Sequence, residues 1–250
     1  MPKCSIIAHR GHNIDVPEQT MVAFERAIAL GAEIIEADVQ FTRDGLAVLL
    51  HDDTLDRTTS GTGPVAAMDW SEIARLDAGA WFAPEFAGLH VPTLDELFAL
   101  AEHRNVALCL EAKEQAGVAS GAMVARLARE IARRGRLGRD VVNSSNLAAL
   151  AAAVEAVPGL RIAPDMPEGG PMRASELVAE ARAIGARIIE HHFSELTPEL
   201  VAAVQAEGIE VWAWGPATLA ETKAAYDTGA TGIMGDDVTA IVAVMGTKRH

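Results

Sequence analysis

The most constraining feature of the chain is an alternation of short β-like runs with segments of helical periodicity, repeated about eight times. The β-like runs are Ser5–Ala8, Glu33–Gln40, Val106–Lys113, Val141–Asn143, Leu160–Ala163, Ala186–Glu190, Ile209–Trp214 and Gly232–Met234. The helical segments are Gln19–Leu30, Val118–Arg134, Leu147–Val157, Ala174–Ile184, Pro198–Ala206, Leu219–Asp227 and Val238–Val244. This alternation over 250 residues predicts a parallel sheet closed into a (β/α)8 TIM barrel. A doubly wound open sheet is the alternative.

One long segment breaks the rhythm. Leu46–Leu50 continues extended after the Asp44-Gly45 turn, and the stretch between His51 and Pro92 then lacks any strong period. We expect an ordered insertion after the second strand, at approximately residues 52–92, that lies over the C-terminal mouth of the barrel. No shift in composition marks a linker, so residues 1–250 are expected to form a single domain.

The charge balance restricts the partners of the chain. Lys and Arg number 21 against 35 Asp and Glu, which gives a net charge of −14. Such a surface repels nucleic acid phosphates and anionic membranes, so we expect neither as a partner. A small phosphorylated substrate has to be held by a local cationic spot. The sequence leaves open whether copies of the chain form a homo-oligomer.

The start of the sequence, its apolar segments and its cysteines indicate the cellular compartment. The start reaches a charged residue after a very short apolar run, so it does not resemble a signal peptide, and no segment is apolar enough for stable membrane insertion. Two cysteines, Cys4 and Cys109, do not make a disulfide framework. We therefore expect a cytoplasmic protein.

Acidic side chains alternate along two of the predicted strands. Glu36 and Asp38 share one face of their strand, and Glu111 and Lys113 share one face of the next. With the apolar faces packed under helices, these side chains point into the barrel. Three such carboxylates need neutralisation. Either one divalent cation, Mg2+ or Ca2+, binds the three oxygen ligands, or Arg10 and Lys113 balance them in a structural ion-pair cluster.

Two histidines follow strand ends at the same edge of the predicted sheet. His9 follows the first strand, and His51 follows Leu46–Leu50, the extended segment after the second strand. An imidazole with an ordinary pKa near 6.5 accepts or donates a proton at neutral pH. Cleavage of a phosphodiester needs one group that takes a proton from the attacking oxygen and another that protonates the leaving alkoxide. Arg10 and Lys113 supply the cationic spot for the phosphate.

A long ordered series of motifs resembles the glycerophosphodiester phosphodiesterase family, densely over residues 8–113 and more thinly to the end. The matching motifs are His9-Arg10-Gly11, Pro17-Glu18-Gln19-Thr20, Glu36-Ala37-Asp38-Val39, His51-Asp52, Leu76-Asp77-Ala78-Gly79, Val91-Pro92-Thr93-Leu94 and Leu110-Glu111-Ala112-Lys113. The chain also resembles cytoplasmic bacterial members in length.

The resemblance implies a (β/α)8 barrel with a small insertion after the second strand and a role for each site residue. Glu36, Asp38 and Glu111 would bind one divalent cation, and His9 and His51 would act as the acid–base pair. Arg10, Lys113 and Trp212 would contact the substrate, Trp212 through the glycerol carbons. The implied reaction is hydrolysis of a small-molecule glycerophosphodiester to glycerol 3-phosphate and an alcohol.

Three departures from the family pattern leave the specificity for the alcohol half of the substrate undefined. Gln19 stands where the family usually has Asn, Trp212-Ala213-Trp214-Gly215 replaces Trp-Thr-Val-Asn, and Gly235-Asp236 replaces Thr-Asp. We expect one of His191 and His192 to face the mouth, and Asp52, Asp56 and Arg57 to order a loop. A lysophospholipase-D-like activity, a non-catalytic barrel that binds a phosphorylated ligand, and a sugar-phosphate isomerase are the alternatives.

Overall fold

A computed structural model describes residues 4–113, 115, 118, 121–166 and 173–246. Within these residues eight parallel strands lie in the order β6-β5-β4-β2-β1-β9-β8-β7. A parallel bridge between Asp165, which follows β6, and Glu190 of β7 connects the two ends of this order and closes the ring. The parallel strands are β1 (Ser5–Ala8), β2 (Ile34–Phe41), β4 (Ala107–Ala112), β5 (Val141–Ser144), β6 (Arg161–Pro164), β7 (Ile188–His192), β8 (Glu210–Trp214) and β9 (Gly232–Gly235). The predicted (β/α)8 barrel is therefore confirmed, and the open sheet is wrong.

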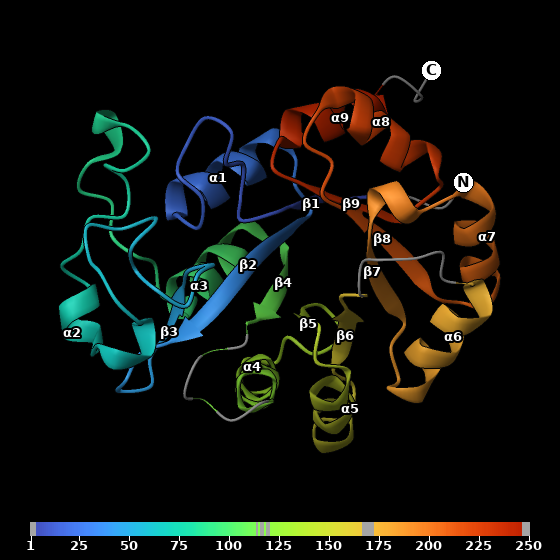
Figure 1. The fold of residues 1–250 in the computed structure, drawn as a ribbon, viewed down its shortest axis with the longest axis horizontal. Coiled ribbons are helices and arrows are strands. Elements are labelled where there is room, and N and C mark those ends of the chain that lie inside the picture. Colours follow the sequence, from blue (N-terminus) through green and yellow to red (C-terminus); the bar gives the residue numbers. More distant parts are fainter. Residues whose placement is uncertain (1–3, 114, 116–117, 119–120, 167–172, 247–250) are drawn as a thin grey trace.

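Helices surround the strands on the outside of the ring (Figure 1). They are α1 (Met21–Leu30), α3 (Leu94–Arg104), α4 (Ala122–Arg133), α5 (Leu147–Ala156), α6 (Ala174–Ala183), α7 (Pro198–Ala206), α8 (Leu219–Asp227) and α9 (Val238–Gly246). No helix in the described part of the chain is long and apolar enough to cross a bilayer.

Two helices begin later than the sequence predicts. Gln19 has a left-handed φ of 56°, so α1 begins at Met21 with Thr20 as its cap. Gly121 has a φ of 82°, and α4 begins after it, whereas Val118 lies outside the helix. Helix α3 was not expected at all, although Thr93 and Glu96 form a capping box at its start.

The segment that breaks the alternation is an insertion after the second strand. Strand β3 (Ala47–Leu49) turns back and pairs antiparallel with β2. Short elements follow before α3: a 3-10 turn at Val65–Ala67, α2 (Trp70–Ile73) and a second 3-10 turn at Pro84–Phe86. Val48, Leu55, Val65 and Ile73 are fully buried in a small core of their own, which orders this segment.

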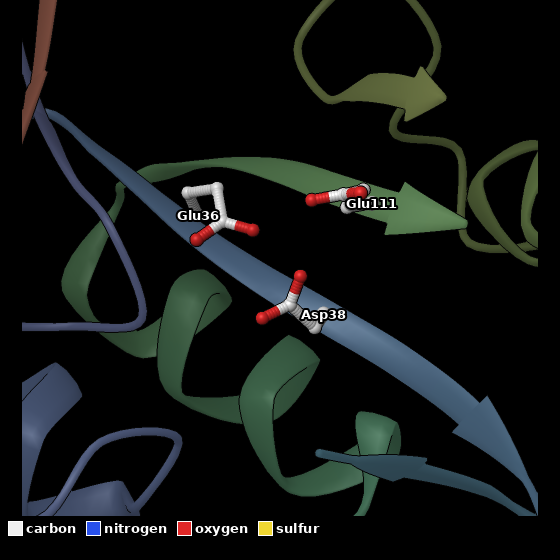
Figure 2. A group of neighbouring side chains, drawn as sticks. All are labelled: Glu36, Asp38 and Glu111. Atoms are coloured by element: carbon white, nitrogen blue, oxygen red, sulfur yellow. The ribbon is translucent and has the colours of Figure 1, made fainter. Parts of the chain in front are cut away.

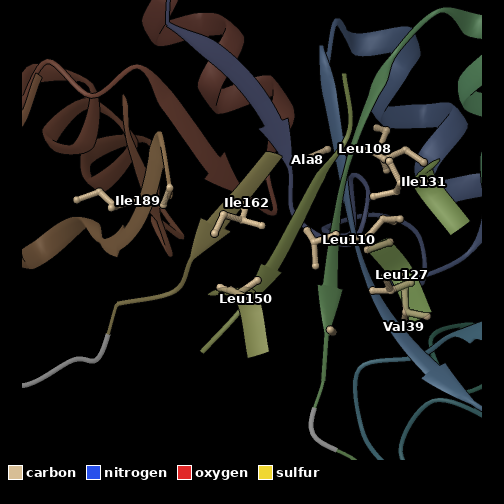
Figure 3. Packing of buried hydrophobic residues seen from close by; sticks show 14 of the residues in the cluster. Ala8, Val39, Leu108, Leu110, Leu127, Ile131, Leu150, Ile162 and Ile189 are labelled. Carbon is tan, nitrogen blue, oxygen red and sulfur yellow. The ribbon is translucent and has the colours of Figure 1, made fainter. Parts of the chain in front are cut away.

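The faces of the strands divide the core into two layers. Ile35, Ala37 and Val39 of β2 point outward into the large cluster beneath the helices, together with Leu108 and Leu110 of β4. Figure 3 shows this packing against Leu127 and Ile131 of α4. The inner layer is a separate cluster that fills the barrel, made of Ile7, Cys109, Val141, Ala163, Ile188, Trp212 and Met234. Because neighbours along a strand alternate between the layers, the polar residues of β2 and β4 lie on the inner side.

Candidate active site

The C-terminal ends of the parallel strands surround a cavity of about 230 Å3. Its lining is mostly polar and comes from all eight barrel strands or the loops that follow them. The lining residues are His9, Arg10, Glu36, His51, Glu111, Lys113, Asn143, Asp165, Glu190, Trp214 and Met234. The structure therefore brings together most of the residues that the sequence singles out.

Glu36, Asp38 and Glu111 converge beside this cavity. Figure 2 shows the first two on β2 and the third on neighbouring β4, with their carboxylates turned toward one another. One oxygen from each lies within 4.8 Å of the others. Asp38 pairs in register with Glu111, and Glu36 precedes it by two residues on the same face. The strand register thus produces the three-carboxylate cluster that the sequence predicts.

The three acids differ in their electrostatic surroundings. Burial raises the pKa of Glu36 well above its ordinary value, and the charges of Asp38 and Glu111 add to the effect. Burial and the Asp38 charge likewise raise the pKa of Glu111 to about 7. Burial acts in the same direction on Asp38, but Lys113 and Arg10 outweigh it and hold the pKa of that carboxyl at about 2.

Two cations contact the cluster without neutralising all of it. Arg10 Nε lies 3.0 Å from Asp38 Oδ2, and Lys113 Nζ lies 3.1 Å from Asp38 Oδ1 and 2.6 Å from Glu111 Oε1. Among the described residues, Glu36 accepts a hydrogen bond only from the backbone N–H of Arg10, at 2.8 Å on Oε2. Its other oxygen, Oε1, is buried and has no hydrogen-bond partner in the described part of the chain. A buried carboxylate oxygen left over beside two further acids suits a hard divalent cation.

A tight turn after β1 places His9 and Arg10. Arg10 has a φ of 55°, in the left-handed region, and its carbonyl accepts the N–H of Gln19, which lies in the same region. The Gln19 amide donates to Asp38 Oδ2 at 2.7 Å. The longer side chain that replaces the usual Asn thus still reaches the carboxylate cluster. Strain of this kind is retained where the surrounding structure fixes it.

Gly11 is required in this turn. Its φ is +85°, and a Cβ there would lie 2.7 Å from the carbonyl carbon of Ala23. We expect Gly11→Ala to lower the free energy of unfolding by about 2–4 kcal/mol, measured by urea titration. Gly63→Ala is the matched control, since φ is +90° there and no atom lies within 4 Å of the added carbon. It should cost only about 1 kcal/mol, and equal losses in the two variants would contradict the close approach at Gly11.

Each predicted catalytic histidine has an aspartate on the same ring atom. His9 Nδ1 lies 2.8 Å from Asp236 Oδ1, and Asn13 donates to the same oxygen at 2.9 Å. His51 Nδ1 lies 2.6 Å from Asp52 Oδ1. Because an ionised carboxylate only accepts, each Nδ1 carries a proton, and each Nε2 is left for proton transfer.

A chain of ion pairs connects His51 with Arg10. Arg57 donates to Asp52 at 2.8 Å and to both oxygens of Glu18, and Glu18 also contacts Arg10 at 3.3 Å. The pKa of Asp52 is lowered to about 2, chiefly by its hydrogen bond with Arg57. Burial lowers the pKa of His51, and the positive charges of Arg10 and Lys113 contribute. Asp52 and Arg57 therefore form an ion pair within the loop, as expected, and Asp56 accepts the Gly63 N–H at 2.9 Å. Asp52 also orients His51, which was not expected.

The structure corrects the placement of one substrate residue. Trp212 is only 1% exposed and belongs to the inner core layer, so it does not line the cavity. Trp214, two residues further along β8 on the same face, lines the cavity instead. Both side chains point inward, but Trp212 lies one layer deeper in the barrel.

The two neighbouring histidines of β7 have different surroundings. His191 is buried, with Nδ1 3.3 Å from Glu195 Oε2. The His192 ring packs edge-on against Trp214, with 4.8 Å between ring centroids, and its Nδ1 lies 2.7 Å from the Ser194 hydroxyl. Neither histidine is among the residues that line the cavity. His192 shares the inward side of β7 with Ile188 and Glu190 and pairs in register with Trp214, so the expectation that one of the two faces the mouth stays a prediction.

Glu190 also lines the cavity and was not predicted from the sequence. Glu190 is 3% exposed, accepts a hydrogen bond from Asn143 Nδ2, and lies 3.4 Å from the Cys109 thiol. Burial raises its pKa well above the ordinary value, and the charge of Asp165 adds to this. Strand alternation could have placed Glu190 inward, because Ile188 two residues earlier belongs to the inner layer.

Comparison with known proteins identifies the chain. The model of the glycerophosphoryl diester phosphodiesterase family matches residues 9–240. Fold and site thus define a phosphodiester-hydrolysing enzyme built on a (β/α)8 barrel. A glycerophosphodiester phosphodiesterase of Caldanaerobacter subterraneus subsp. tengcongensis is 33% identical over 96% of this chain and 97% of its own. The chain belongs to the glycerophosphoryl diester phosphodiesterase family.

Solved structures agree with this assignment. A glycerophosphodiester phosphodiesterase from Agrobacterium tumefaciens superposes with a TM-score of 0.83 at 29% identity, over 96% of this chain and 100% of that one. An Oleispira antarctica phosphodiesterase in complex with the product sn-glycerol-3-phosphate has the same fold, with a TM-score of 0.86 at 24% identity over 97% and 96% of the two chains. Family membership favours the phosphodiesterase over the sugar-phosphate isomerase and the non-catalytic barrel.

Proposed function

We propose that this enzyme hydrolyses glycerophosphodiesters to glycerol 3-phosphate and an alcohol, with one divalent cation and two histidines. The observation that carries the proposal is the convergence on one cavity of three carboxylates, two cations and two imidazoles, each imidazole held by an aspartate. The glycerol 3-phosphate held as product by the fold relative supports the same substrate class.

Glu36, Asp38 and Glu111 would hold one divalent cation, Mg2+ or Ca2+. When bound, it would offset the negative charge of the acids and of a phosphate oxygen. Arg10 and Lys113 bind the remaining phosphate oxygens, and the overall charge of −14 makes these two side chains necessary.

The two imidazoles carry the protons. One Nε2 accepts the proton of the attacking hydroxyl, either of water or of the glycerol 2-hydroxyl, as the new O–P bond forms. The other, protonated on both nitrogens, donates to the alcohol oxygen as the old P–O bond breaks. Asp52 and Asp236 orient the rings and stabilise the charged form that each passes through. If the glycerol hydroxyl attacks first, water opens the cyclic phosphate in a second step with the roles exchanged.

Phosphorus NMR of reaction mixtures tests the proposal. With several glycerophosphodiesters we expect the glycerol 3-phosphate resonance to appear with Mg2+ or Ca2+ and to be suppressed at least about 100-fold by EDTA. Adding the cation back should restore the rate. Unchanged turnover in EDTA would contradict the metal site, and a phosphorylated alcohol in place of glycerol 3-phosphate would contradict the bond that we propose is cleaved.

We also propose a cytoplasmic location. Cys4 and Cys109 are both buried free thiols, which suits a reducing compartment.

A further inference from the structure

The cavity has a second wall, formed by strands that carry none of the residues used above. In the closed ring, β1 lies opposite β6, β2 opposite β7, and β4 opposite β8. The carboxylates of β2 and β4 and the His9-Arg10 turn after β1 therefore face the other half of the ring. The rest of the lining is Asn143 from β5, which lies beside Glu111 in register, and, across the ring, Asp165 after β6, Glu190 from β7 and Trp214 from β8. We call these four residues the far wall.

The far wall is acidic and rich in hydrogen-bond acceptors. It carries two carboxylates, and no Lys or Arg is found among the described residues that line it. Asn143 is 3% exposed, and its Oδ1 is buried without a hydrogen-bond partner in the described part of the chain, while its amide nitrogen donates to Glu190. A phosphate group does not suit this wall, because both carboxylates would repel it. A ligand with a positive charge and N–H donors suits it.

Trp214 adds a fixed aromatic surface to the same wall. Its ring is held from behind by His192, at 4.8 Å between centroids. His192 in turn fills the space beside Gly215, where a Cβ would lie 2.7 Å from the imidazole. Trp is the aromatic residue that attracts a cation most strongly.

On these grounds we propose that the far wall binds a primary ammonium group on the alcohol half of the substrate. Glu190, Asp165 and Asn143 Oδ1 accept its N–H bonds, and Trp214 covers it. The inference rests on the proposed function: with the phosphate held by Arg10 and Lys113, the amino-alcohol extends across the cavity to the opposite strands. Glycerophosphodiesters of ethanolamine type are then the preferred substrates, and Glu190 is a specificity-determining residue.

Two diesters of nearly equal size test the proposal. Glycerophosphoethanolamine carries the ammonium, and its ethylene glycol analogue carries a neutral hydroxyl at the same position. With the metal-loaded wild type we expect kcat/KM for the ammonium substrate to exceed that for the analogue by at least about tenfold. Glu190→Gln should reduce this ratio to about threefold or less, because the amide keeps the shape and cannot ionise beside the ammonium. Asp165→Asn is a second variant with the same expectation.

Glu199→Gln is the matched control, because Glu199 is exposed in the first turn of α7 and does not line the cavity. It should keep the wild-type ratio. A ratio near one in the wild type overturns the inference, and so does an equal loss on both diesters in Glu190→Gln, which would assign this wall to the glycerol half or to stability. Hydrolysis of neither diester by the wild type would instead overturn the proposed function, and the inference with it.

Discussion

Replacement of Glu36 by Gln is expected to reduce turnover by at least about 1,000-fold and to leave the metal-free protein at least as stable as the wild type. Turnover falls because the cation site loses a ligand. Stability is maintained because burial and two neighbouring carboxylates disfavour the charge on Glu36. The Gln oxygen can still accept the Arg10 N–H that Glu36 accepts at 2.8 Å. Phosphorus NMR gives the rate, and urea unfolding in EDTA gives the stability.

Asp38→Asn is the matched comparison, with the same loss of activity and the opposite effect on stability. Lys113 and Arg10 hold the pKa of Asp38 at about 2, against an ordinary 3.8, so the carboxylate stabilises the folded chain at every pH above about 4. This difference in pKa corresponds to about 2 kcal/mol in the free energy of unfolding at neutral pH. The stabilisation is lost as the pH falls toward 2.

The two variants together distinguish a metal site from a structural ion-pair cluster. If the cluster is structural, Glu36→Gln destabilises the metal-free protein by several kcal/mol, because a buried partner is removed. That result, with activity retained in EDTA, would overturn the metal assignment.

His9→Ala and His51→Ala are each expected to reduce kcat by at least about 100-fold without loss of folding. Both side chains line the cavity, and each has its Nδ1 fixed by an aspartate. Because they act in one reaction, the double variant should be little worse than the worse single variant. Initial rates over a range of pH give the measurement, since removal of either group should abolish one limb of the profile.

His90→Ala controls for the loss of a surface imidazole, because the His90 side chain is 49% exposed and pairs with Glu96 away from the cavity. It should retain wild-type turnover. Asp52→Asn and Asp236→Asn should fall between this control and the histidine variants, with losses of about 10- to 100-fold. Near-wild-type rates in His9→Ala or His51→Ala would remove that residue from its proposed role.

Much of the site could be predicted because strand alternation is a local property. Side chains two residues apart on a strand share a face, so Glu36 and Asp38 must lie together, and the apolar row of Ile35, Ala37 and Val39 sets which face is inner. The number of strand–helix units likewise predicted a closed barrel. The resemblance to the family supplied the roles of the histidines and the cations.

How deep an inward-pointing side chain lies in the barrel could not be predicted from strand alternation. Trp212 and Trp214 have the same parity, so alternation places both inward and cannot tell which one reaches the cavity. The stagger between neighbouring strands decides this. Trp212 pairs with Gly232, at the first residue of β9, whereas Trp214 pairs with Met234, near the strand's C-terminal end. The tryptophan that lines the cavity is therefore not the predicted residue but the next inward position.

The sequence also could not predict contacts between side chains that lie far apart in the chain. Asp236 follows His9 by 227 residues, and only the pairing of β1 with β9 brings them together. The far wall arises in part in the same way: β5 pairs directly with β4, whereas β6, β7 and β8 face β1, β2 and β4 only because the ring is closed.

The sequence by itself determined the barrel, the inward faces of its strands and the three-carboxylate cluster, because those follow from alternation within single segments and between adjacent ones. The tertiary structure alone decided that Asp236 holds His9, which tryptophan lines the cavity and what faces the three-carboxylate cluster. These depend on ring closure and strand stagger, which bring together side chains that no local pattern connects.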